Sequence, residues 1–166
     1  MAGALIVLAQ LGKADFAWLD SLRKRYYPAD RNRVPAHLTL FRTLPPSAEA
    51  EVRRSLARAA GIAAPEARLS GVLDMDSGVA LRVDSPGLAE IRGQLEQEFR
   101  GLLTAQDMGR WTPHVTIQNK AEPREAKKLL RQMRESFEPR PLAIAGLQLV
   151  RYSDGEWEEI TAWRFR

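Results

Sequence analysis

The chain has 166 residues, which is enough for one domain with a sizeable core, and its composition of 45% apolar and 28% charged residues excludes an intrinsically disordered chain. The net charge of +4 favours an anionic substrate but is too small for a dedicated nucleic-acid coat. Because there is no cysteine, disulfides, thiolate nucleophiles and cysteine-based metal sites are excluded. The apolar run at residues 4–9 is too short for a membrane span and lacks the basic start of a signal peptide, so we expect a cytoplasmic protein with no membrane partner. We also expect a monomer.

The first half of the chain predicts alternating strands and helices. A short aliphatic run ends at Gly12, and the helical spacing of Phe16, Leu19 and Leu22 follows it. Ser47 has the character of a helix N-cap. The predicted elements are a strand over residues 3–10, a helix over 13–26, a strand over 37–43, a helix over 47–60 and a strand over 67–75.

The second half predicts the same order of elements. A tight turn at residues 76–78 joins the previous strand to its hairpin partner, and Ser85-Pro86 starts a helix with one apolar face. The predicted elements are a strand over residues 79–83, a helix over 85–99, a loop over 106–112, a strand over 114–118, a helix over 123–137 and strands over 142–152 and 157–166.

An eight-residue pattern occurs once in each half. Residues 33–40 and 110–117 both place an Arg four positions before a His, followed by apolar–Thr–apolar, and they are displaced by 77 positions. The two histidines of the chain both lie in these copies. We interpret the pattern as an internal duplication of about 1–77 and 78–166 within a single bilobal α+β domain. Pseudo-twofold symmetry would bring the two motif strands together across a cleft.

Alternate side chains of a strand share one face. His37, Thr39 and Phe41 are therefore expected to point the same way in the first motif strand. His114, Thr116 and Gln118 are expected to do so in the second.

Two imidazoles and two hydroxyls around one pocket are typical of phosphate-ester chemistry. One imidazole can take a proton while the other gives one, and the hydroxyls can donate to non-bridging oxygens. A metal site is not expected, because two histidines alone are too few ligands.

The two copies, His37-Leu38-Thr39-Leu40 and His114-Val115-Thr116-Ile117, resemble the twin His–apolar–Thr/Ser–apolar motifs of the 2H phosphoesterase superfamily. That superfamily includes the 2′-5′ RNA ligase-like proteins and cyclic nucleotide phosphodiesterases. The resemblance covers the whole chain. It implies an antiparallel sheet in two pseudo-symmetric lobes flanked by helices, with the four motif residues lining a central cleft.

The resemblance also implies an activity that needs no metal and no cofactor. The reaction would be cleavage of 2′,3′-cyclic phosphates at RNA ends or in small cyclic nucleotides, giving a 2′-phosphate, or joining at a 2′-5′ linkage. His114 would be the base that activates water, and His37 would be the acid that protonates the departing 3′ oxygen. In a reversible ligase the two roles would swap.

The residues after the two motifs differ. Ligase-like members often carry an Arg two positions after the second motif, where this chain has Asn119 and then Lys120. Arg42 holds the corresponding place after the first motif. Lys120 or Arg42 would supply the positive charge, although a regular strand would turn Arg42 to the face opposite His37.

Further substrate-binding candidates each have a structural alternative. Arg33 and Arg110 either guide phosphates into the cleft or bond loop carbonyls and carboxylates. Phe41 either stacks a base or belongs to the core. For the whole cleft, the alternatives to an enzyme are a non-catalytic module that binds RNA ends or nucleotides, and motif strands that only pack.

Overall fold

The computed structural model describes residues 3–166. Its strands are β1 (Ala4–Leu11), β2 (Leu38–Leu44), β3 (Arg68–Asp74), β4 (Val79–Asp84), β5 (His114–Gln118), β6 (Arg140–Pro141), β7 (Ile144–Ser153) and β8 (Glu156–Arg164). Its helices are α1 (Lys13–Tyr26), α2 (Glu49–Ala59), α3 (Pro86–Glu98), α4 (Ala105–Met108) and α5 (Pro123–Ser136), with a 3₁₀ turn at Pro46–Ala48. No helix in this part of the chain is long and apolar enough to cross a membrane.

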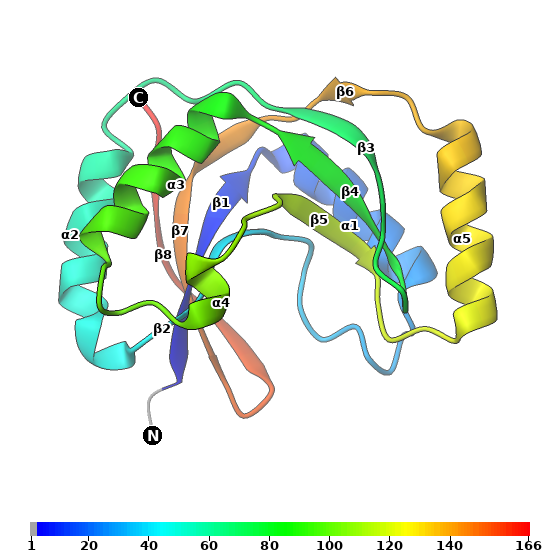
Figure 1. Ribbon diagram of the computed structural model, residues 1–166, viewed down its shortest axis with the longest axis horizontal. Helices are drawn as coiled ribbons and strands as arrows, with labels where there is room; N and C mark the ends of the chain where they lie inside the picture. Colours follow the sequence, from blue (N-terminus) through cyan, green and yellow to red (C-terminus); the bar gives the residue numbers. More distant parts are fainter. Residues whose placement is uncertain (1–2) are drawn as a thin grey trace.

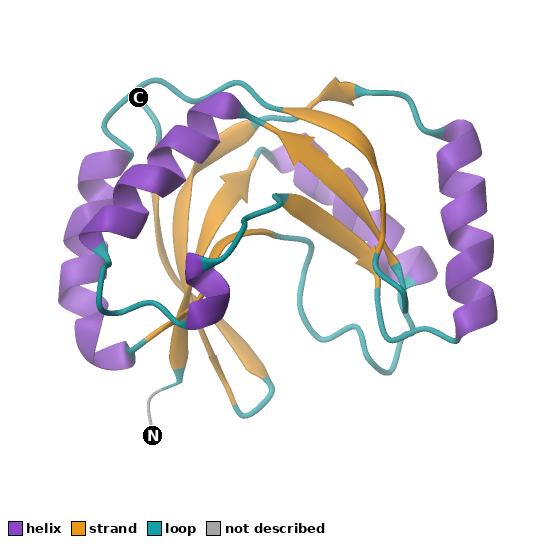
Figure 2. Cartoon of the chain, viewed as in Figure 1, coloured by secondary structure: helices purple, strands orange, loops and turns teal. Residues whose placement is uncertain are grey.

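The strands form one eight-stranded antiparallel sheet in the order β6-β3-β4-β5-β2-β1-β7-β8 (Figure 1). Helices α2 and α3 lie over one end of this sheet, and α1 and α5 over the other (Figure 2). The predicted α+β class with two helix-flanked lobes is confirmed. The lobes meet where β2 pairs with β5, through the single register pair Leu38 and Val115.

The strand order is symmetric about that junction. If β1 corresponds to β4, β2 to β5 and β3 to β7, the sequence of strands outward from the centre is the same on both sides. The duplication inferred from the two motifs would account for this order.

The two lobes nevertheless do not correspond to residues 1–77 and 78–166. Strand β3 of the first half pairs with β4, and β7 of the second half pairs with β1. The helices cross over too: Arg23 on α1 donates to the carbonyl of Thr116 on β5, and Ser55 on α2 donates to Glu98 on α3. Each lobe is therefore built from both halves of the sequence.

The lobe formed by β1, β2, β7, α2 and α3 holds most of the apolar core. Helix α3 begins at Pro86, and the Ser85 hydroxyl caps it by accepting from the N–H of Leu88 at 3.2 Å. Its apolar face buries Leu88 and Leu95 completely against α2 and the sheet. Helices α2 and α3 therefore cover this face of the sheet in this lobe (Figure 1).

Three local predictions are corrected. Ser47 is not an N-cap, because Pro46–Ala48 forms a 3₁₀ turn and α2 starts at Glu49 after an N-cap without a side-chain bond. Helix α4 overlaps the start of the expected loop over 106–112, and β6 is a further two-residue strand. Both elements are too short for hydrophobic periodicity to indicate them.

Candidate active site

The four motif side chains meet at the junction of the two lobes. Leu38 and Val115 are fully buried and oppose each other in register. The residues flanking them therefore project from the other face of the sheet. His37, Thr39, His114 and Thr116 all line one pocket of about 330 Å³ there.

Both histidines are held in the same way. The Nδ1 atom of His37 lies 2.8 Å from the carbonyl oxygen of Pro35, and that of His114 lies 2.7 Å from the carbonyl oxygen of Thr112. Because a carbonyl can only accept, each Nδ1 must carry the proton of that bond. This leaves Nε2 of both rings as the atom that can exchange a proton with a ligand.

Burial lowers the pKa of His37 to about 4, and the positive charges of Arg23, His114 and Arg42 add to this effect. The hydrogen bond to Pro35 opposes it. The Trp157 ring covers one side of the imidazole, with the ring centroids 5.0 Å apart. His37 is therefore neutral near pH 7 and can accept a proton.

A β-bulge follows each motif. Val7 pairs with Phe41 and Leu8 pairs with Thr39, so Leu40 is an extra residue in β2. Likewise, Val79 pairs with Gln118 and Ala80 with Thr116, so Ile117 is the extra residue in β5. Leu40 and Ile117 are 77 positions apart, as are the motifs themselves.

The bulges change which side chains reach the pocket, because one extra residue reverses the alternation of all those that follow. The predicted shared faces are wrong for Phe41 and Gln118. Phe41 is fully buried and packs edge-on against Phe99, with centroids 5.4 Å apart. Gln118 is 4% exposed, and its side-chain amide donates to the carbonyl of Tyr26 at 3.2 Å.

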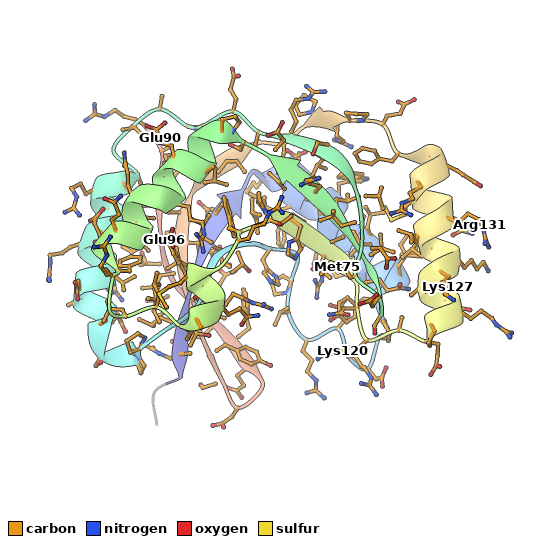
Figure 3. All side chains as sticks on the ribbon, viewed as in Figure 1. Met75, Glu90, Glu96, Lys120, Lys127 and Arg131 are labelled. Carbon is orange, nitrogen blue, oxygen red and sulfur yellow. The ribbon has the colours of Figure 1, made fainter. Side chains whose placement is uncertain are left out.

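The same bulge brings Arg42 to the pocket. The regular strand considered above would turn it away from His37, but the extra residue at Leu40 returns it to the motif face, where it lines the site. Arg110 lines the pocket as well, whereas Arg33 is exposed and does not. Lys120 is exposed in the loop between β5 and α5 (Figure 3) and is not among the residues that line the pocket.

Three residues that the sequence did not single out hold the bulged segment of β2. The carboxylate of Asp107 accepts from the backbone N–H groups of Arg42 at 2.9 Å and Thr43 at 3.0 Å. Arg92 donates from Nε to the carbonyl of Leu40 at 2.9 Å and from Nη2 to that of Asp107 at 2.8 Å. The indole N–H of Trp111 donates to the carbonyl of Thr39 at 3.0 Å.

These three side chains also line the pocket, so the residues that hold the backbone of β2 form part of the pocket wall. Asp107 and Arg92 are buried, 3% and 5% exposed. Burial lowers the pKa of Arg92 from its usual value, while Glu96 and Asp107 oppose this shift. One sequence signal was available: Thr104 and Asp107 have capping-box spacing, and the Thr104 hydroxyl accepts from the N–H of Asp107 at 3.4 Å.

The second motif strand has its own buried arginine. Arg23 is 2% exposed, and it donates from Nη1 to the carbonyl of Thr116 at 3.0 Å. Its Nε and Nη2 both point to the side-chain oxygen of Asn32, at 3.3 and 3.1 Å. A buried guanidinium group thus donates to a backbone carbonyl of each threonine-bearing strand. Within residues 3–166, no three His, Asp or Glu side chains cluster in a way that could hold a metal ion.

Two inward-facing His–Thr pairs on symmetric strands match the arrangement that the resemblance to the 2H phosphoesterases implies. The model of the 2′-5′ RNA ligase superfamily matches residues 12–156. The chain belongs to the 2′-5′ RNA ligase superfamily, within the 2H phosphoesterases that the motifs resemble. Membership indicates phosphoesterase or 2′-5′ RNA ligase-like activity.

Solved structures share the fold over nearly the whole chain. The protein TT0787 of Thermus thermophilus is 18% identical, with a TM-score of 0.66 and 98% of both chains covered. LigT of E. coli, crystallised with 3′-AMP, is 17% identical, with a TM-score of 0.60 and 99% of both chains covered. A structure described as a phosphoesterase is 20% identical, with the same TM-score and coverage. No curated protein sequence matches the chain.

Proposed function

We propose that this protein is a metal-independent phosphoesterase that opens 2′,3′-cyclic phosphates, on RNA ends or on small nucleotides, to give a 2′-phosphate. One observation carries the proposal: the structure brings both His–Thr pairs to one pocket and fixes each Nδ1 on a carbonyl, so that both Nε2 atoms can act on one phosphate. E. coli LigT, which shares the fold, has been crystallised with 3′-AMP and with NADP⁺, and this supports a nucleotide as the ligand.

In hydrolysis, His37 takes the base role because its lowered pKa leaves the ring neutral. Its Nε2 removes a proton from water as the water oxygen forms a bond to phosphorus. The bond from phosphorus to the 3′ oxygen breaks, and His114 gives its Nε2 proton to that oxygen. This order is the reverse of the one implied by the resemblance.

The hydroxyls and the arginines act on the charge of the phosphate. Thr39 and Thr116 line the pocket beside the histidines and donate to the non-bridging oxygens, whose charge grows in the transition state. Arg42 and Arg110 line the same pocket and supply positive charge to hold the anion.

The superfamily description favours one further reaction at the same site, the joining of RNA ends at a 2′-5′ linkage. A 5′ hydroxyl of RNA would then take the place of water as the group that loses its proton to His37. Incubation of RNA halves with the protein, followed by digestion with a nuclease specific for 3′-5′ linkages, tests this. A resistant junction supports ligation, and its absence leaves hydrolysis alone.

The identity of the hydrolysis product tests the main proposal. Cyclic nucleotides bearing each of the four bases are incubated with the protein, and phosphorus NMR distinguishes a 2′-phosphate from a 3′-phosphate. We expect the 2′-phosphate alone. A 3′-phosphate would mean that the 2′ oxygen departs, which would contradict the proposed geometry of attack.

A further inference from the structure

A second pocket adjoins the catalytic pocket on the side of β3 and β4. It has a volume of about 510 Å³ and is lined by those strands, by the start of α3 and by residues 110–113. Arg110, Trp111 and Thr112 line both pockets, so the two pockets adjoin along this segment. We call it the Arg82 pocket, after the cation that projects into it from β4.

Arg82 is placed beside the catalytic residues by the sheet itself. It is the direct antiparallel register partner of His114, and such partners project from the same face about 4.5–5.5 Å apart. Arg82 is exposed, since its neighbours Leu81 and Val83 occupy the buried face of β4. A group bound by Arg82 would thus lie next to a phosphate bound by His114.

The Arg82 pocket has positive charge available for a ligand. Both Arg82 and Arg110 line it, and throughout residues 3–166 no carboxylate lies within ion-pair distance of either. One acidic residue, Asp84, lines it, so the pocket has an excess of one positive charge when Arg110, which it shares with the catalytic pocket, is counted. The hydroxyls of Ser70 and Thr112 stand along the same wall and can donate to an anion, whereas the Ser85 hydroxyl already donates to the carbonyl of Glu66.

The corresponding space on the other lobe is different. It adjoins the catalytic pocket at His37, has only about 200 Å³, and is bordered by Trp157, whose ring packs against His37. Its charged residues, Lys13 and Glu159, are of opposite sign. The two pockets that flank the catalytic pocket therefore differ in size and charge, and an extended anionic substrate would leave the catalytic pocket toward Arg82.

We propose that the Arg82 pocket binds a second phosphate group of the substrate, one sugar away from the phosphate that reacts. In a nucleotide with a 2′,3′-cyclic phosphate, that group is the phosphate on the 5′ oxygen of the same ribose. The proposal rests on the proposed function and narrows it: nucleotides with a 5′ phosphate are preferred over cyclic nucleosides without one. The 5′ phosphate can be a terminal monophosphate or the first internucleotide link of an RNA.

Three substrates test the subsite and distinguish a terminal 5′ monophosphate from an internucleotide phosphate as the group that it binds. They are adenosine 2′,3′-cyclic phosphate, the same compound with a 5′-monophosphate, and a diadenylate that ends in a 2′,3′-cyclic phosphate. We expect kcat/KM to rise about tenfold when the 5′ phosphate is added, and this gain to shrink as salt screens the charges. A gain with both phosphorylated substrates indicates recognition of the phosphate itself, and a gain with the diadenylate alone indicates the internucleotide link.

The Arg82→Gln variant should bring the ratio of kcat/KM between phosphorylated and unphosphorylated substrates close to one. Arg131→Gln makes the same change of charge on the outer side of α5 (Figure 3) and should leave the wild-type ratio. A ratio near one in the wild type, or an unchanged ratio in Arg82→Gln, would overturn the subsite.

Equilibrium binding tests the subsite independently of the proposed function, because it does not require turnover. If no cyclic phosphate is turned over, the proposed function fails, and the subsite is then judged by calorimetry. Adenosine 3′,5′-bisphosphate should bind about tenfold more tightly than adenosine 3′-monophosphate, and Arg82→Gln should remove that difference. Equal affinities for the two nucleotides would reject the subsite.

Discussion

At the scale of single residues, the site depends on a neutral His37. Its pKa of about 4 follows from burial, aided by nearby cations. Proton NMR of the imidazole should therefore show a midpoint near pH 4. Arg42→Ala removes one of those cations and should raise the midpoint. A midpoint near the ordinary value of about 6.5 in the wild type would contradict the burial argument.

The same shift makes stability depend on pH. The unfolded chain binds the His37 proton more tightly than the folded protein does, so the stabilisation is complete above the unfolded pKa of about 6.5. It is lost as the pH falls from there toward 4, at a cost of roughly 3 kcal/mol. Urea unfolding at a series of pH values should show this loss in the wild type, and His37→Asn should lack most of it.

The threonine hydroxyls should matter to the rate more than to stability. Thr39→Val or Thr116→Val removes a donor to the reacting phosphate and should lower kcat about a hundredfold. Thr→Ser at either position keeps the hydroxyl and should retain most activity. Steady-state kinetics and thermal unfolding on the same variants separate the two effects, and an equal loss in the Ser variants would point to packing instead.

At the scale of secondary structure, the bulge in β2 decides which side chains the pocket receives. Asp107 holds that bulge through the N–H groups of Arg42 and Thr43, so it acts as a positioning residue for the Arg42 side chain. Asp107→Asn should raise KM about tenfold with a smaller change in kcat, because an amide oxygen replaces only part of the carboxylate.

A double-mutant cycle tests this coupling. Arg42→Ala should raise KM by a similar factor, and the double variant should be no worse than either single one, because both changes remove the same interaction. Additive effects would show that Asp107 acts on something other than Arg42. Leaving its partner N–H groups unpaired in Asp107→Ala should also cost about 1–3 kcal/mol of stability per group.

The helices and strands could be predicted from the sequence more fully than the set of side chains that line the pocket. Aliphatic runs and helical spacing were enough to predict the long helices and all strands but β6, and the two motifs indicated the four inward-facing residues. The expected alternation of side chains between the two strand faces was wrong beyond Leu40 and Ile117, where each strand has a bulge. Such a bulge is stabilised by side chains that are distant in the sequence, such as Arg92. Nothing local to residues 38–44 indicates that a guanidinium on α3 will hold that backbone.

At the scale of the whole molecule, the two halves of the sequence interlock. Strand β3 of the first half pairs with β4 of the second, and β7 of the second half pairs with β1 of the first. A chain of residues 1–77 would lose the partner of β3 and expose the sheet face that α3 covers. We expect this fragment and that of residues 78–166 to be unfolded separately by circular dichroism and to gain structure when mixed. Independent folding of either one would argue against the interlock.

The central claim is that His37 and His114 act together on one phosphate without a metal. Its most direct test is the turnover of a 2′,3′-cyclic nucleotide by the wild type in EDTA and by His37→Ala and His114→Ala, with folding verified by circular dichroism. We predict full activity in EDTA and a loss of at least about a hundredfold in each folded variant. Wild-type turnover in either variant, or loss of activity in EDTA, would contradict the claim.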